Sequence, residues 1–539
     1  MTLDRRSMLV GGSAGLASAG LLAVPGHAAE RAREREDTPG APVSKQDWVD
    51  VRHFGATGDG TTIDTPAINR AIEHVAARGG GTVHFPPGIY ACYTIRLKSR
   101  VTLFVDRGAT ILGAPAPTDG RGGYDLAEPI GPHGAYQDFG HGHWANSLIW
   151  GDGLHDIAII GSGLIWGKGV GRGDGLDQYL KDPSGPGTAN KAIALKNCRN
   201  VLLRDFSVLE GGWFALLATG VDNLTVDNLL VDTNRDGFDI DCCRNVRVTN
   251  CTVNSPYDDA ICPKSSFALG YPRATENLTI ANCFVTGNYV IGSVINGTWR
   301  KMPASFAPLV HGRIKFGTES NGGFRNVTIT NCVFDDSQGL ALETVDGADF
   351  EDITVSNITM RGSFTSPLFL RLGRRMRGPK GARIGSMKRV LIQNVTSSNA
   401  GLLPSIIAGI PGHPIEDVKI SDVILHQRGG APAAMALLRP PLNELAYPEP
   451  NMFGDLPATG FFIRDAKNVE MSNVEIAVAA DDPRPAIRLE NVEDADFFRM
   501  RLPRSSAGYS LEGVTHFRSF GSRWMKDRVL DGRIAASEF

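Results

Sequence analysis

A short alternation of apolar and polar residues returns along most of the chain. Each copy begins with Asn or Asp, places apolar residues at every second position, and contains a second Asn or Asp near its middle. The copies start at Asn200, Asn223, Asn245, Asn277, Asn326, Asp352, Asp417 and Asn468. Period-two alternation rich in β-branched residues predicts strands, and the Asn or Asp predicts a turn.

The spacing of the copies predicts how these strands are arranged. The first three start at residues 200, 223 and 245, and we interpret the later intervals of 32, 49 and 26 residues as the same repeat with loop insertions. A period of about 20 to 30 residues with strands in each repeat is typical of a solenoid, and its strand crossovers are right-handed. We therefore expect an all-β fold, a right-handed parallel β-helix (solenoid), as a single domain over residues 47–539.

A second column of apolar segments follows the first. Its members start at Asp236, Asp259, Val290, Gly312, Leu340 and Leu368. Because the steps are close to one coil each, residues far apart in the sequence should be neighbours on this column.

The segment 65–78 differs from the rest of the chain. Its apolar residues follow helical spacing, and glycines from Gly79 to Gly81 end it. We expect a short helix that caps the open N-terminal end of the solenoid core.

The N-terminus has the features of an export signal. Arg5 and Arg6 precede a weakly apolar stretch over residues 9–24, followed by small residues ending at Ala28 and Ala29. A membrane anchor is the alternative, but the stretch is short and rich in glycine. We expect a twin-arginine signal peptide over residues 1–29, a charged flexible leader over residues 30–46, and a periplasmic or extracellular protein that makes no membrane contact after cleavage.

Composition narrows the class of partner. The chain is 42% hydrophobic and 21% charged, and 55 Lys and Arg against 58 Asp and Glu give a net charge of -3. Without a basic excess, nucleic acid is a poor candidate for a partner. We expect a monomer.

The eight cysteines do not form a disulfide framework. Four follow an asparagine, which predicts small buried residues at equivalent repeat positions: Cys198, Cys251, Cys283 and Cys332. At most one local bridge is expected, involving Cys242, Cys243 or Cys251. Zinc spacing is absent from the sequence, so we expect no metal.

Three carboxylates of the second column are the strongest candidates for catalysis. Asp236 and Asp258 are 22 residues apart, one coil, and Asp259 adjoins Asp258. An Asp at the start of a strand often only stabilises a turn. Three carboxylates this close repel one another, however, so the pKa of one should rise to give a general acid while another stays ionised as a base. Glycoside hydrolysis requires this division of roles.

Two cations share the column with these carboxylates. Arg313 and Lys315 are separated by two residues and therefore face the same way. We expect them about 10 Å from the carboxylates, two rungs further along, where they suit an acidic polysaccharide. The candidate substrate-binding residues are Asn234, Lys264, Arg313, Lys315, Glu343 and His311.

Other polar residues leave two interpretations open. Lys264 binds substrate or pairs with the aspartates, and Glu343 touches substrate or closes a turn. Asp239 and Asp241 alternate with core residues, so they line a groove or are solvated. For His141 and His143 a loop role is favoured over a metal pair. The arginines between 371 and 377 form a solvated loop or a wall for an anionic sugar.

The chain resembles glycoside hydrolase family 28, the polygalacturonase family, from about Val51 to beyond Asp417. The segment starting at Asp50 (DVRHFGATGDG) resembles the opening coil of pectate-lyase-like β-helices in general. The specific motifs are NRDGFDID, YDDAICPKS and GRIKFGT, similar to the family's N-T-D-G, G-D-D and R-I-K.

The resemblance implies a role for each matched residue. Asp258 is the general acid, Asp236 and Asp259 position and activate water, and Arg313 and Lys315 bind the substrate carboxylate. The implied reaction is hydrolysis with inversion, without metal or organic cofactor.

The chain also departs from the family pattern. The family's G-H-G motif between the acid pair and R-I-K is missing, and His311 is the nearest substitute. Arg235 replaces Thr, and Tyr257 replaces Gly before the acid pair. Insertions at 296–312, 374–384 and 439–460 would close one end of a groove and favour an exo mode or a branched pectic oligosaccharide.

Two other functions compete with an exported pectin-degrading hydrolase. A polysaccharide lyase on the same fold would use an Arg or Lys base, and usually calcium, to act on uronate polymers. A non-catalytic carbohydrate-binding β-helix would bind the glycan without forming product.

Overall fold

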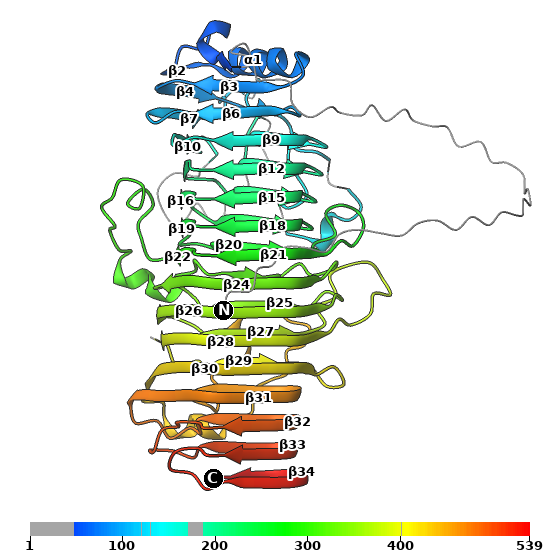
Figure 1. Cartoon of the computed structure of the whole chain (residues 1–539), viewed down its shortest axis with the longest axis vertical. Coiled ribbons are helices and arrows are strands. Elements are labelled where there is room, and N and C mark those ends of the chain that lie inside the picture. The colour runs from blue at the N-terminus through cyan, green and yellow to red at the C-terminus, as the bar shows by residue number, and fades with distance from the viewer. Residues whose placement is uncertain (1–47, 120, 130, 139, 171–186, 400) are drawn as a thin grey trace, which may run out of the picture. The chain divides into compact units, whose positions relative to one another are not determined.

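Parallel strands stack coil upon coil through the part of the chain that this computed structural model describes. The described residues are 48–119, 121–129, 131–138, 140–170, 187–399 and 401–539, and they belong to one unit, Lys45–Phe539. The predicted signal peptide and the whole of the predicted leader lie outside the described residues. In Figure 1 the strands form parallel rows from β9 and β12 down to β33.

The first coils contain short strands. Their bounds are β1 (Trp48–Asp50), β2 (Asp59–Ile63), β3 (Gly81–Phe85), β4 (Gly88–Cys92), β5 (Ile95–Arg96), β6 (Val101–Val105), β7 (Ala109–Gly113), β8 (Ser147–Asp152), β9 (His155–Ile160), β10 (Leu164–Trp166), β11 (Lys191–Lys196), β12 (Arg199–Arg204) and β13 (Ser207–Leu209). The coils that carry the candidate site continue with β14 (Phe214–Thr219), β15 (Asp222–Asp227), β16 (Leu230–Asp232), β17 (Asp236–Asp241), β18 (Arg244–Thr249), β19 (Thr252–Asn254), β20 (Ile261–Lys264), β21 (Thr275–Ala281), β22 (Phe284–Thr286) and β23 (Lys315–Phe316).

Longer strands form the C-terminal coils. They are β24 (Phe324–Asp335), β25 (Leu340–Thr344), β26 (Phe350–Ser363), β27 (Leu368–Leu372), β28 (Met387–Asn399), β29 (Ser405–Ala408), β30 (Ile415–Gly429), β31 (Phe461–Ala480), β32 (Ile487–Phe498), β33 (Tyr509–Phe520) and β34 (Arg528–Glu538). Short 3-10 helices lie at η2 (Val51–Phe54), η3 (Gly134–Tyr136), η5 (Ala304–Leu309), η6 (Ala433–Leu437) and η7 (Pro450–Phe453). Among the named strand pairs of the described chain, β33 with β34 alone is antiparallel.

The register confirms the predicted repeat. Val201 pairs with Leu224, Leu224 with Val246, and Val246 with Leu278, so equivalent residues of successive copies lie side by side. Their apolar side chains point into the coil and are almost fully buried. Burial of this continuous apolar column stabilises each coil against the next.

Asparagine starts each copy because of its backbone and its side chain. Asn223 and Asn245 have φ values of 55° and 56°, in the left-handed region that asparagine tolerates better than most residues. Asn245 Nδ2 donates to Asn223 Oδ1 at 3.0 Å, and Asn223 Nδ2 donates to Asn200 Oδ1 at 2.9 Å. The predicted turn residues therefore form a ladder of side-chain hydrogen bonds along the stack.

The predicted capping helix is confirmed as α1 (Thr65–Ala77). Ile68, Ile72 and Val75 are buried against the core of the first coils. Figure 1 shows α1 at the blue N-terminal end of the stacked strands. The helix thus covers apolar surface that has no preceding coil to bury it.

Two details of the predicted repeat were wrong. The segment from Val290, predicted as a rung of the second column, is a series of turns, and Ile261 on β20 pairs directly with Ile314. The interval between Asp352 and Asp417 holds an unpredicted coil, because Ile353 pairs with Val390 and Val390 with Val418.

The cysteines are all free and buried, so the expected local bridge was wrong. Cys198, Cys251, Cys283 and Cys332 are at most 2% exposed, as predicted for small residues at equivalent positions.

Within the described part of the chain, no helix combines the length and the apolarity needed to cross a membrane.

Candidate active site

The three predicted carboxylates meet on adjacent rungs. Asp236 is the first residue of β17, and Asp258 and Asp259 lie in the turn before β20, which pairs with β17. The Asp259 backbone N–H donates to Asp236 Oδ1 at 3.2 Å. Asp236 and Asp259 are 3% and 2% exposed, whereas the Asp258 side chain is 17% exposed. Asp258 is therefore the most accessible of the three, and the catalytic roles stay a prediction.

Charges around the site separate the acidities of two aspartates. Burial, followed by repulsion from Asp258 and Asp239, raises the pKa of Asp236 well above its ordinary value. Burial would also raise the pKa of Asp258, but the cations of Arg235, His311 and Lys315 outweigh it and hold that pKa below its ordinary value. When no substrate is bound, Asp236 is therefore the carboxyl that holds a proton, whereas Asp258 is ionised.

Arg235, which replaces the family's threonine, holds Asp258 ionised. Its Nη2 and Nε donate to Asp258 Oδ2 at 2.6 and 3.1 Å. The guanidinium also lies over the Trp213 ring, 4.8 Å from its centroid. The sequence departure at this position therefore changes the chemistry of the predicted acid.

Arg313 and Lys315 lie much closer to the carboxylates than predicted. Arg313 Nε donates to Asp259 Oδ1 at 2.8 Å, and Lys315 Nζ is 3.6 Å from Asp259 Oδ2. The expected 10 Å gap was wrong because the Val290 segment forms no rung, so the segment of Arg313, just before β23, follows β20 directly. Their predicted role in binding a substrate carboxylate stays untested by this placement.

A carboxylate from a distant insertion meets the same two cations. Glu449 Oε1 accepts from Arg313 Nη2 at 2.6 Å and from Lys315 Nζ at 3.2 Å. Tyr447 OH lies 3.2 Å from Lys315 Nζ. Burial would raise the pKa of Glu449, but the two cations lower it to about 2. Sequence analysis missed Glu449, since the only signal was the insertion at 439–460.

Glu343 lies beside these groups on β25 and is fully buried. Both of its carboxyl oxygens lack a hydrogen-bond partner among the described residues. Burial, which outweighs the attraction of Lys315 and Arg313, raises its pKa to about 8. The side chain is therefore mainly neutral at pH 7, and it lies within a strand, which removes the turn interpretation.

The remaining predicted binders occupy different positions. His311 lies close to Asp258 and Asp259: one side-chain atom from each lies within 4.8 Å of the others. Asn234 is 8% exposed, and its Oδ1 has no partner in the described chain. Lys264 Nζ is 3.2 Å from Glu319 Oε2, so its partner is a glutamate and not one of the aspartates. His311 is thus the predicted binder that lies beside the acid pair, and its role as the substitute for the missing G-H-G histidine stays a prediction.

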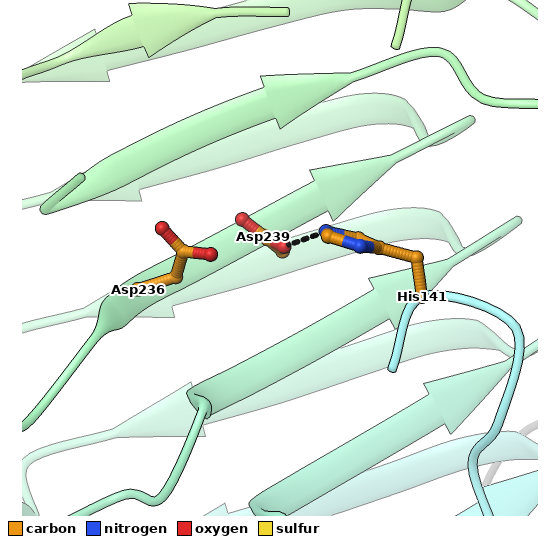
Figure 2. A group of neighbouring side chains, drawn as sticks. All are labelled: His141, Asp236 and Asp239. Atoms are coloured by element: carbon orange, nitrogen blue, oxygen red, sulfur yellow. Dashed lines mark hydrogen bonds and ion pairs between the residues drawn. The ribbon is translucent and has the colours of Figure 1, made fainter. Parts of the chain in front are cut away.

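A buried histidine–aspartate pair adjoins Asp236. His141 Nε2 and Asp239 Oδ2 are 2.7 Å apart, and Figure 2 shows His141 reaching Asp239 from a separate segment, with Asp236 beside them. Burial and the charge of Lys264 lower the pKa of His141, but the hydrogen bond to Asp239 and the negative charges of Asp239 and Glu319 together outweigh them and raise it. Asp239 and Asp241 are fully buried, so the solvated interpretation was wrong for both.

Among the described residues, two sets of side chains have donor atoms close enough to hold a metal ion. One is His141, Asp236 and Asp239, and the other is Asp258, Asp259 and His311. In the first set Asp239 already pairs with His141, and in the second Asp258 pairs with Arg235. A cation would therefore have to compete with protein partners, and the expected absence of a metal stays a prediction.

The predicted arginine cluster is paired with protein groups. Arg371 is 1% exposed and donates to the carbonyl oxygens of Gly409 and Leu442. Arg375 pairs with Asp346, and Arg377 Nη2 donates to Glu319 Oε1 at 2.9 Å. These contacts stabilise the surrounding segments, and the solvated interpretation was wrong for the buried Arg371.

A hollow of about 260 Å³ lies next to the His141 segment. Its lining includes Glu128, His133, Trp144 and Lys196. The Lys196 ammonium lies 3.9 Å from the centroid of the Trp144 ring. Trp144 is 3% exposed, and the lysine cation stabilises its position by a cation–π contact.

Comparisons with known proteins match this architecture. A family model described as rhamnogalacturonase A/epimerase, pectate lyase-like, matches residues 48–131. A probable polygalacturonase from Vitis vinifera is 23% identical over 398 residues, covering 69% of this chain and 73% of that protein. An exo-poly-alpha-D-galacturonosidase from Dickeya chrysanthemi is 23% identical over 390 residues, covering 58% of this chain and 62% of that protein, less than two thirds of its length.

A solved structure has the same fold. The family 28 exopolygalacturonase from Yersinia enterocolitica has a TM-score of 0.60 and 19% identity, covering 85% of this chain and 78% of that chain. Together the matches confirm the predicted resemblance to the polygalacturonase family and the right-handed parallel β-helix.

Proposed function

We propose that this polygalacturonase-like chain is an exported hydrolase that cleaves pectin-like glycans of the galacturonate or rhamnogalacturonan type. Its polygalacturonase and exopolygalacturonase relatives support a glycoside hydrolase with a polysaccharide substrate. The observation that carries the proposal is the convergence of Asp236, Asp258 and Asp259 on adjacent rungs. Export through the twin-arginine pathway to the periplasm or the medium rests on the N-terminal sequence alone.

Asp258 acts as the general acid in this proposal. It is the most accessible of the three aspartates, so it is the one able to reach the leaving oxygen of a bound glycan. Asp236 and Asp259 then position the attacking water, which gives inversion by a single displacement. The supporting evidence is the motif match and the accessibility of Asp258.

Proton transfer requires Asp258 to gain a proton that the free site places on Asp236. The two carboxyls repel each other, so together they hold one proton more readily than none. The cation of Arg235 biases that proton away from Asp258. Arg235 is therefore a positioning residue that sets the pH range of the proposed acid.

The proposed hydrolase cleaves its glycan from a chain end, in an exo mode. The 439–460 insertion carries Glu449 to the carboxylate cluster, which supports a substrate path closed on that side. The Dickeya chrysanthemi relative is named for exo cleavage. Release of only short products from a long glycan would support this mode.

The proposal is tested on a panel of polygalacturonate and rhamnogalacturonan fragments. The protein and its Asp258→Asn variant are incubated with each substrate, with and without chelator, while reducing ends and unsaturated-uronate absorbance are followed. New reducing ends without absorbance, insensitive to chelator and lost in the variant, support the hydrolase. Chelator-sensitive absorbance would identify a lyase, and glycan binding without product would identify a binding protein.

A further inference from the structure

Arg313 and Lys315 are already neutralised by carboxylates of the protein. Their side chains are 1% and 3% exposed. Asp259 pairs with both, and Glu449 pairs with both from the opposite segment. Two cations therefore face two carboxylates, so these four side chains balance one another in charge.

Glu343, the third carboxyl group at this position, adds no negative charge. Glu343 is fully buried, and its pKa of about 8 leaves it mainly protonated near neutral pH. Ionising it would only add negative charge beside Asp259 and Glu449. Arg313, Lys315, Asp259, Glu449 and Glu343 together therefore carry no net positive charge near neutral pH.

The segment that carries Glu449 is firmly anchored. Phe453, Leu456 and Ala458 are buried in an apolar cluster with Phe369 and other residues of the β25, β27, β29 and β31 column. Arg464 donates to the carbonyl oxygens of Pro440 and Pro441 at 2.9 and 3.0 Å. Displacing this segment would expose the apolar cluster to water, which is unfavourable. Glu449 is therefore a fixed part of the site.

We propose that Glu449 takes the place of a substrate carboxylate beside Arg313 and Lys315, so that the sugar unit bound there is neutral. This inference rests on the proposed function and narrows its substrate class. A uronate at this position would bring a further carboxylate against Glu449, while the charges of Arg313 and Lys315 are already balanced by Asp259 and Glu449. A backbone that alternates uronate with a neutral deoxy sugar, as rhamnogalacturonan does, meets this requirement, and a polymer with uronate at every position does not.

The first test compares two substrates with the unaltered protein. The probes are an oligogalacturonate and a rhamnogalacturonan oligosaccharide of equal length. We expect kcat/KM to be at least about tenfold higher for the second, the ratio that one unbalanced charge produces at a charge-assisted contact. A preference for the oligogalacturonate would overturn the inference, and this arm requires no variant to fold.

The second test removes the carboxylate. Glu449→Gln should raise kcat/KM for the oligogalacturonate about tenfold, because Arg313 and Lys315 then carry an unbalanced charge. Glu444→Gln is the matched control, since Glu444 lies in the same insertion and pairs with Arg374, away from the carboxylates. A folded Glu449→Gln variant, verified by circular dichroism, that gains nothing over this control contradicts the inference.

Binding separates this inference from the proposed function. Calorimetry with the Asp258→Asn variant measures oligogalacturonate affinity, with and without Glu449→Gln, and requires no turnover. If the unaltered protein cleaves neither glycan, the proposed function fails. The inference still stands if Glu449→Gln raises the affinity about tenfold, and it fails if the affinity does not change.

Discussion

Arg235 donates two hydrogen bonds to one oxygen of Asp258, from the position where the family motif has threonine. A guanidinium at 2.6 Å favours the ionised carboxylate, whereas a general acid must be protonated before it acts. Arg235 is thus the largest of the charges that hold the pKa of Asp258, the predicted acid, below its ordinary value.

Replacing Arg235 with threonine should extend activity to higher pH. Loss of the cation raises the pKa of Asp258, so a larger fraction of the acid stays protonated as pH rises. We expect the alkaline limb of the kcat/KM profile to move upward by about one unit or more. Arg235→Lys, which keeps the charge, should leave the limb near its original position, and an unmoved limb in the threonine variant would exclude this control of Asp258.

The role of Asp258 can be separated from those of the other aspartates by changing the leaving group. On a natural glycan, Asp258→Asn should lower kcat by about 10²- to 10⁴-fold. An aryl glycoside with an acidic phenol needs no proton, so the variant should lose far less activity on it. Asp236→Asn, proposed to act on water, should lose activity on both substrates. Equal losses for Asp258→Asn on the two substrates would argue against proton donation by this residue.

Glu343 should make the stability of the protein depend on pH. Its folded-state pKa of about 8 lies above the ordinary value of 4.5, so the folded state holds the proton more tightly than the unfolded state. This contribution is fully present below about pH 4.5 and is lost as pH rises toward 8. Glu343→Gln mimics the neutral form, so we expect its Tm to equal that of the parent at pH 5 and exceed it by a few degrees at pH 9. The same difference at both pH values would contradict the assignment.

The asparagine ladder should be measurable as stability. Asn277 has a φ of 56°, donates to Asn245 Oδ1 at 2.9 Å, and accepts from Asn326 Nδ2 at 2.7 Å. Asn277→Ala should lower the free energy of unfolding by about 1–3 kcal/mol, from the left-handed backbone and the lost hydrogen bonds. Denaturant unfolding measures the loss. Thr279→Ala, on the same strand but outside the ladder, is the control and should cost less.

The repeat and the three carboxylates could be predicted from sequence for one physical reason. A coil has nearly constant length, so residues one period apart, such as Asp236 and Asp258, must lie on adjacent rungs. Alternation along each strand then decides which side chains face the core, as with Val246 and Leu278. Local periodicity therefore determined the fold, the capping helix and the position of the acid cluster.

Only the tertiary structure decided what surrounds those carboxylates. Insertions interrupt the period, so sequence spacing misplaced Arg313 by counting the loop after Val290 as a rung. His141 and Glu449 reach the site from loops that obey no repeat, and their partners Asp239 and Arg313 lie 98 and 136 residues away in the chain. The conformation of such loops depends on packing with distant residues. The sequence by itself therefore determined the solenoid and its catalytic candidates, whereas tertiary packing decided the distances, protonation and charge balance that govern its substrate.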